Sequence, residues 1–153
     1  WGWESFQEFN KEKSFLNKFL FPCPKSSYGW ASFHGELIAL CGEDGESLFP
    51  CLLMPGVQKD EEGKGGRKAK PFSPQSQTPS GVACIYCHAN GEDIGLVYEA
   101  GHWISDNLGV HVVIPEYPGY GLANGEPNER TVYTNVLAAY QMLVRGMQFS
   151  PKS

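Results

Sequence analysis

The chain has 153 residues, of which 41% are hydrophobic, which is enough for one domain with an apolar core. Its net charge of −5 argues against a general nucleic-acid binder, because such proteins need basic surface to neutralise phosphates. No run of residues approaches the roughly 20 consecutive apolar positions of a membrane-spanning helix.

The cysteines are odd in number and irregular in spacing, which is not typical of a secreted disulfide framework. They are Cys23, Cys41, Cys51, Cys84 and Cys87. Free cysteine also packs as a small hydrophobic residue. The sequence therefore predicts a reducing compartment and a cytoplasmic protein.

Residues 1–21 are expected to form an amphipathic helical segment that ends before Pro22. Apolar side chains recur at helical spacing, with lysines between them: Phe6, Phe9, Leu16, Phe19, Leu20, Lys11, Lys13 and Lys18. This pattern has two interpretations, a peripheral contact with a membrane surface or a helix packed on the domain. Both remain open at this point.

Next along the chain, two apolar runs at 33–40 and 47–54 flank a Gly- and Asp-rich stretch, which predicts a β-hairpin. Residues 57–80 contain almost no large apolar side chain and are rich in Gly, Pro and Ser, so we expect a disordered insertion. A basic run from Lys64 to Lys70 is interpreted as solvated linker charge, with a localisation or anionic-lipid signal as the alternative.

The remaining segments alternate between strand and helix patterns. Residues 82–87 form a continuous apolar run, which predicts a strand buried on both faces at the centre of a parallel sheet. A helix from about Ile94 should end at Gly109, before a strand at 110–114. A second helix should begin after Asn128 and end at Gly146. Its buried face is predicted to comprise Tyr133, Val136, Leu137, Tyr140 and Val144.

Two motifs in these segments carry a family resemblance. His88-Ala89-Asn90-Gly91-Glu92-Asp93 resembles the His-Gly-Asn turn of the α/β-hydrolase superfamily. The run from Glu116 to Glu129, with Tyr117-Pro118-Gly119-Tyr120-Gly121 near its start, resembles the segment after the fourth strand in depalmitoylase-like and serine aminopeptidase-like serine hydrolases. The resemblance implies an α/β fold, namely the N-terminal half of an α/β-hydrolase: a β-hairpin followed by parallel strands in a βαβα order.

The resemblance also implies a role for the first motif. In the family, the turn after the third strand supplies one backbone N–H of the oxyanion hole. By that match Asn90 donates its N–H, while His88, Ala89 and Gly91 shape the turn. Ala89 stands where the family has Gly, so we expect Gly91 to take the permissive backbone conformation.

The resemblance implies a serine hydrolase that acts on acyl esters or thioesters, including protein depalmitoylation. No Gly-x-Ser-x-Gly elbow occurs in the 153 residues, so no catalytic residue is assigned within them. We therefore expect an incomplete domain over 22–146, an interruption at 57–80 and a truncated tail at 147–153. We expect no metal ion, cofactor or nucleic-acid partner, and the substrate would be an acyl ester or thioester.

Two alternatives belong to other functional classes. The chain could be a non-catalytic remnant or an interaction module of the same fold. Cys84, Cys87 and His88 also spell Cys-x-x-Cys-His, the attachment signature of c-type haem, which raises a haem or redox protein as the other alternative. We expect both cysteines to be core residues, because they lie within an apolar run.

Overall fold

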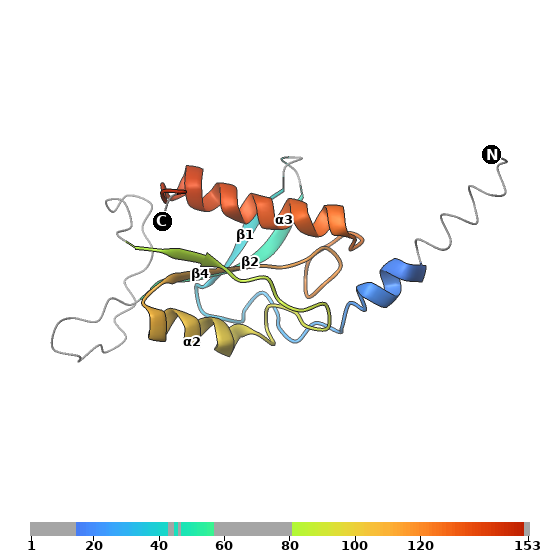
Figure 1. The fold of residues 1–153 in the computed structure, drawn as a ribbon. Helices are drawn as coiled ribbons and strands as arrows, with labels where there is room; N and C mark the ends of the chain where they lie inside the picture. Colours follow the sequence, from blue (N-terminus) through green and yellow to red (C-terminus); the bar gives the residue numbers. More distant parts are fainter. Residues whose placement is uncertain (1–14, 43–44, 46, 57–80, 152–153) are drawn as a thin grey trace.

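The computed structural model describes residues 15–42, 45, 47–56 and 81–151, and it shows a four-stranded sheet with a helix on each face (Figure 1). The strands are β1 (Leu37–Cys41), β2 (Leu48–Met54), β3 (Ala83–Ile85) and β4 (His111–Pro115), in the order β1-β2-β4-β3. β1 and β2 form the predicted antiparallel hairpin, and β3 runs parallel to β4. The pair β2–β4 is antiparallel, so the sheet is mixed.

α2 (Tyr98–Leu108) and α3 (Glu129–Gln141) lie on opposite faces of the sheet, and α3 continues into a π-helical turn, η1 (Met142–Gly146) (Figure 1). α2 ends where the sequence predicted, because Gly109 adopts the left-handed conformation and its N–H bonds to Ser105 O. α3 begins at the predicted cap: Asn128 accepts from the Thr131 N–H, and the Thr131 hydroxyl accepts from the Asn128 N–H.

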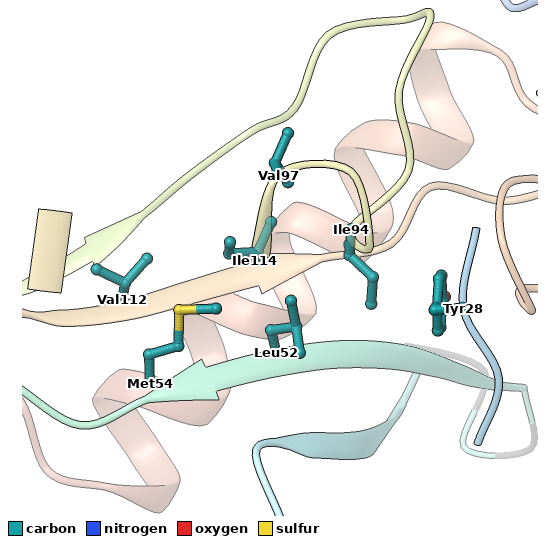
Figure 2. Close-up of a cluster of buried hydrophobic side chains, with 7 residues drawn as sticks. All are labelled: Tyr28, Leu52, Met54, Ile94, Val97, Val112 and Ile114. Atoms are coloured by element: carbon teal, nitrogen blue, oxygen red, sulfur yellow. The ribbon is translucent and has the colours of Figure 1, made fainter. Parts of the chain in front are cut away.

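The two central strands supply apolar side chains to both faces of the sheet. Because successive strand residues point to opposite faces, Leu52 and Met54 of β2 face the α2 side while Cys51 faces the other. The core on the α2 side, the α2-side core, comprises Tyr28, Leu52, Met54, Ile94, Val97, Val112 and Ile114 (Figure 2). The smaller core beneath α3 contains Cys51, Val113, Ala139, Leu143 and Phe149.

The predicted place of β3 in the sheet is wrong. β3 lies at the edge of the described sheet and its three residues are half-buried, whereas β2 and β4 occupy the centre. β2 lies between β1 and β4, and β4 lies between β2 and β3, whereas β3 pairs with β4 alone among the described residues. Cys87 lies beyond the strand and is exposed, so the expectation that both cysteines of the motif are core residues is also wrong.

The helices differ from their predicted patterns in two further ways. α2 begins four residues later than Ile94, because residues 94–97 form turns rather than helix. The buried residues of α3 and η1 are Asn135, Ala138, Ala139 and Leu143, whereas the predicted Tyr133 and Tyr140 are exposed. The small side chains Ala138 and Ala139 face inward and leave room for the bulky residues of the sheet, which explains why the aromatic face points outward.

Residues 15–20 are helical and stop before Pro22, as predicted, and this turn lies to one side of the sheet (Figure 1). The first part of the expected 1–21 helix, the expected insertion at 57–80 and residues 152–153 of the expected tail lie outside the described residues. Within the described residues, no helix combines the length and apolar character that a membrane crossing requires.

Candidate functional site

The segment after β3 forms a closed turn at the carboxyl end of the parallel strand pair. The Tyr86 N–H donates to Val113 O at 2.8 Å, so the chain follows β4 up to that point. The turn itself is closed by a bond of 3.0 Å from Glu92 N to Ala89 O, and the Glu92 carboxylate accepts from the Ala89 N–H at 3.1 Å. We call residues 88–92 the His88 turn.

The His88 turn forms without left-handed backbone. Neither Ala89 nor Gly91 has a positive φ, so the expectation that Gly91 takes the permissive conformation is wrong. Closure by the Glu92 N–H and side chain allows an ordinary turn, in which the Cβ of Ala89 causes no strain.

His88 is buried beneath the turn. Its ring stacks on Tyr117 with centroids 3.9 Å apart, and its Nδ1 lies 3.2 Å from Ala89 O. Its Nε2 lies 3.0 Å from Glu116 Oε1, and both side chains are fully buried. Among the described residues no group forms an aligned hydrogen bond with Nε2, so its contact with Glu116 is a close approach of two buried polar atoms.

Glu116 is a site residue that the sequence analysis missed. It directly follows β4, and its two carboxylate oxygens serve different partners. Oε1 faces His88 and accepts from the Tyr117 N–H at 3.1 Å. Oε2 accepts from the Tyr28 hydroxyl at 2.8 Å and from the Ile94 N–H at 3.3 Å. The sequence does show a carboxylate directly after an apolar strand, and a carboxylate that is buried there needs hydrogen-bond or charged partners.

Two tyrosines of the second motif hold the turn from the β4 side. The Tyr117 hydroxyl donates to His88 O, and the Tyr120 hydroxyl donates to Asn90 O, both at 2.8 Å. Burial raises the pKa of Tyr120 to about 12 and also raises the pKa of Tyr117, so both hydroxyls remain protonated donors near neutral pH. The two sequence motifs therefore meet in space.

These contacts leave the Asn90 N–H without a hydrogen-bond acceptor among the described residues. Asn90 lies at the outer surface of the turn, its carbonyl is occupied by Tyr120, and no described group accepts a hydrogen bond from its backbone N–H. A fixed, unpaired backbone N–H is the type of donor that stabilises a developing oxyanion.

A second buried carboxylate joins the His88 turn to the segment before β1. Asp93 accepts from the Ser27 hydroxyl and from the Ser27 and Leu96 N–H groups. Burial opposes ionisation, yet these hydrogen bonds and one from the Gly95 N–H hold the pKa of Asp93 below its ordinary value. The residue directly after the His88 turn is thus anchored.

Gly121, directly after Tyr120, makes close packing around Glu116 possible. Gly121 has a φ of +51°, and a Cβ there would lie 2.3 Å from Glu116 Oε2 and 2.5 Å from the Tyr28 hydroxyl. The network around Glu116 therefore requires glycine at this position.

The structure disfavours the haem reading of Cys84, Cys87 and His88. The His88 ring is buried against Glu116 and Tyr117 and does not face a space that could hold a macrocycle's iron. All five cysteines are free thiols, with Cys84 half-buried and Cys87 exposed. Across the described ranges, no three His, Cys, Asp or Glu side chains gather where they could bind a metal ion.

Comparison with protein-family models found no match. Among curated proteins, the chain is 29% identical over 59 residues to the alpha/beta hydrolase domain-containing protein aho-3 of Caenorhabditis elegans, covering 39% of this chain and 18% of that protein. It is 26% identical over 69 residues to alpha/beta hydrolase domain-containing protein 17C of mouse and of human, covering 45% of this chain. The matched stretch spans only about a fifth of each relative. These partial matches support a relationship to the α/β-hydrolase superfamily.

Proposed function

We propose that this chain supplies the oxyanion-hole side of a serine hydrolase acting on acyl esters or thioesters. The observation that supports this proposal best is at Asn90, an exposed residue whose N–H has no acceptor among the described residues and whose carbonyl is fixed by Tyr120. When a nucleophile attacks an acyl carbonyl, negative charge develops on the carbonyl oxygen, and a rigid N–H about 3 Å away lowers the barrier.

In this proposal, residues outside these 153 positions carry out the rest of the chemistry. A serine on a Gly-x-Ser-x-Gly elbow would attack the acyl carbon, and the N–H of the residue after it would be the second oxyanion donor. A histidine oriented by an acid would take the serine proton and return it to the leaving alcohol or thiol. Protein depalmitoylation is the finer proposal, supported by the resemblance of the Glu116–Glu129 run to depalmitoylase-like hydrolases.

A fluorophosphonate probe tests the proposal, because it labels activated serines. The full-length product of the gene should be labelled and should hydrolyse an S-palmitoyl peptide, while the 153-residue chain should remain unlabelled. Labelling of the 153-residue chain would show that the nucleophile has been misplaced. An unlabelled, folded full-length protein would instead favour the non-catalytic interaction module.

We also propose that residues 15–20 contact a membrane surface, where acylated substrates reside. Phe15 is 73% and Phe19 is 78% exposed, and Lys18 lies between them on the same turn. Exposed aromatic side chains beside a basic residue suit the boundary between lipid headgroups and acyl chains.

Vesicle co-sedimentation tests this second proposal. Binding to vesicles of phosphatidylcholine with phosphatidylserine should fall when Phe15 and Phe19 are both replaced by serine. Trp103→Ser is the matched control, because Trp103 is an exposed aromatic residue on α2, 64% exposed. Equal loss with the control, or no loss with the double variant, would refute the contact.

A further inference from the structure

We propose that Glu116 is a positioning residue that holds the His88 turn in the conformation needed for oxyanion binding, a role that rests on the proposed function. Its backbone is fixed on both sides. The Glu116 N–H donates to Pro50 O of β2 at 3.0 Å, and the Asn135 side chain of α3 donates to Glu116 O at 2.9 Å. The carboxylate therefore projects from a rigid point of the sheet.

The first oxygen of Glu116 controls the start of the turn. Oε1 lies 3.0 Å from His88 Nε2, and this buried nitrogen has no aligned hydrogen-bond acceptor among the described residues. His88 is only two residues before Asn90, and its ring is confined on its other side by Tyr117. A shift of the carboxylate would therefore move the histidine and change the direction of the Asn90 N–H.

The second oxygen controls the residues that follow the turn. Oε2 accepts from the Ile94 N–H at 3.3 Å and from the Tyr28 hydroxyl at 2.8 Å. Tyr28 is itself fixed, because its hydroxyl accepts from the Leu122 N–H at 3.3 Å. One carboxylate thus contacts the chain before and after Asn90, and it links both sides to β4.

Only a carboxylate satisfies all of these partners. Oε1 accepts from one backbone N–H and Oε2 from another, so glutamine would place its amide NH2 against a donor whichever way it turned. Glu116→Gln keeps the size of the side chain but leaves at least one buried N–H unsatisfied. It is therefore a local test of the carboxylate.

The test combines turnover with a backbone measurement. In the full-length protein, Glu116→Gln should lower kcat for an acyl thioester on the order of 100-fold, the effect expected from misplacing a catalytic group by about 1 Å. KM should change little, because Glu116 does not touch substrate. In the 153-residue chain, the same variant should speed hydrogen exchange of the Glu92 amide, which closes the turn, relative to amides of β2 and β4.

Ser105→Ala is the control for a purely structural loss. Ser105 is buried, and its hydroxyl donates to Pro55 O at 3.0 Å, away from the turn. This variant should lose stability while kcat and Glu92 exchange stay unchanged. If Glu116→Gln fails to fold, Tyr28→Phe removes one donor to Oε2, together with the acceptor of the Leu122 N–H, and should lower kcat in the same direction by a smaller factor.

The outcomes separate this inference from the proposed function. An inactive wild-type protein would overturn the proposed function, and the exchange of the Glu92 amide would then decide alone whether Glu116 holds the turn. An active wild type whose folded Glu116→Gln or Tyr28→Phe variant keeps both kcat and Glu92 exchange would overturn the positioning role.

Discussion

The α2-side core and the polar network at the carboxyl ends of β3 and β4 are both buried, but they are stabilised by different interactions. In the core, Leu52, Met54 and Ile114 contribute burial and close packing, which are not directional. In the network, Glu116 and His88 depend on which atom faces which. We therefore expect the core to respond to changes in volume and the network to respond to changes in single atoms.

Truncation in the core should have the largest effect on stability. Leu52 is fully buried in the central strand β2, so Leu52→Ala should reduce the free energy of unfolding by about 2–5 kcal/mol. Leu52→Met preserves volume and should cost less than about 1.5 kcal/mol. Urea denaturation followed by circular dichroism measures the free energy of unfolding of both variants. Equal losses in the two variants would contradict the expectation that the core responds to side-chain volume.

One added methyl group should damage the network where Glu116 meets Tyr28. Gly121→Ala forces a left-handed conformation, at about 1–2 kcal/mol, and crowds Glu116 Oε2, at about 1–3 kcal/mol more. Gly91→Ala is the matched control, because its Cβ would meet no atom within 4 Å. Thermal unfolding should show a large loss for the first variant and a change within about 0.5 kcal/mol for the second. A similar loss at both positions would argue against the network as described.

The network should also give stability a dependence on acidic pH. Hydrogen bonds lower the pKa of Asp93 in the folded state, so its contribution is fully present above the unfolded value of about 3.9 and is lost as pH falls through the folded value. Asp93→Asn should flatten the fall in stability below pH 4. Denaturation curves from pH 6 to pH 2 measure this effect, and parallel curves for both proteins would exclude Asp93 as a contributor.

The smallest expected change lies outside both regions, at the start of α3. Asn128→Ala removes the cap and should cost about 1 kcal/mol. The nearby exposed residue Asn124 provides the control, since Asn124→Ala removes no described hydrogen bond. A loss in the control equal to that at Asn128 would mean that the capping box does not stabilise the helix.

The sequence predicted features that depend on neighbouring residues, such as the Gly109 stop and the Asn128 cap. It misplaced β3, because the pairing of β2 with β4 joins segments about 60 residues apart, and no local pattern encodes that pairing. Glu116 was missed for the same reason, since its partner Tyr28 lies 88 positions away in the chain. Asn90 could be proposed only because the motifs around it resemble a family.

The most direct test of an oxyanion role for the His88 turn is to remove the backbone N–H of Asn90. Asn90 occupies the second position of the turn closed by Glu92 N and Ala89 O, a position where turns favour proline, and its φ is not positive; Asn90→Pro removes the N–H. Asn90→Ala removes the side chain and keeps the N–H. In the full-length protein, Asn90→Pro should lower kcat for an acyl thioester by a factor of about 100 to 1000, while Asn90→Ala should leave it nearly unchanged. Full activity of a folded Asn90→Pro variant, or equal losses in both variants, would contradict an oxyanion role for this turn.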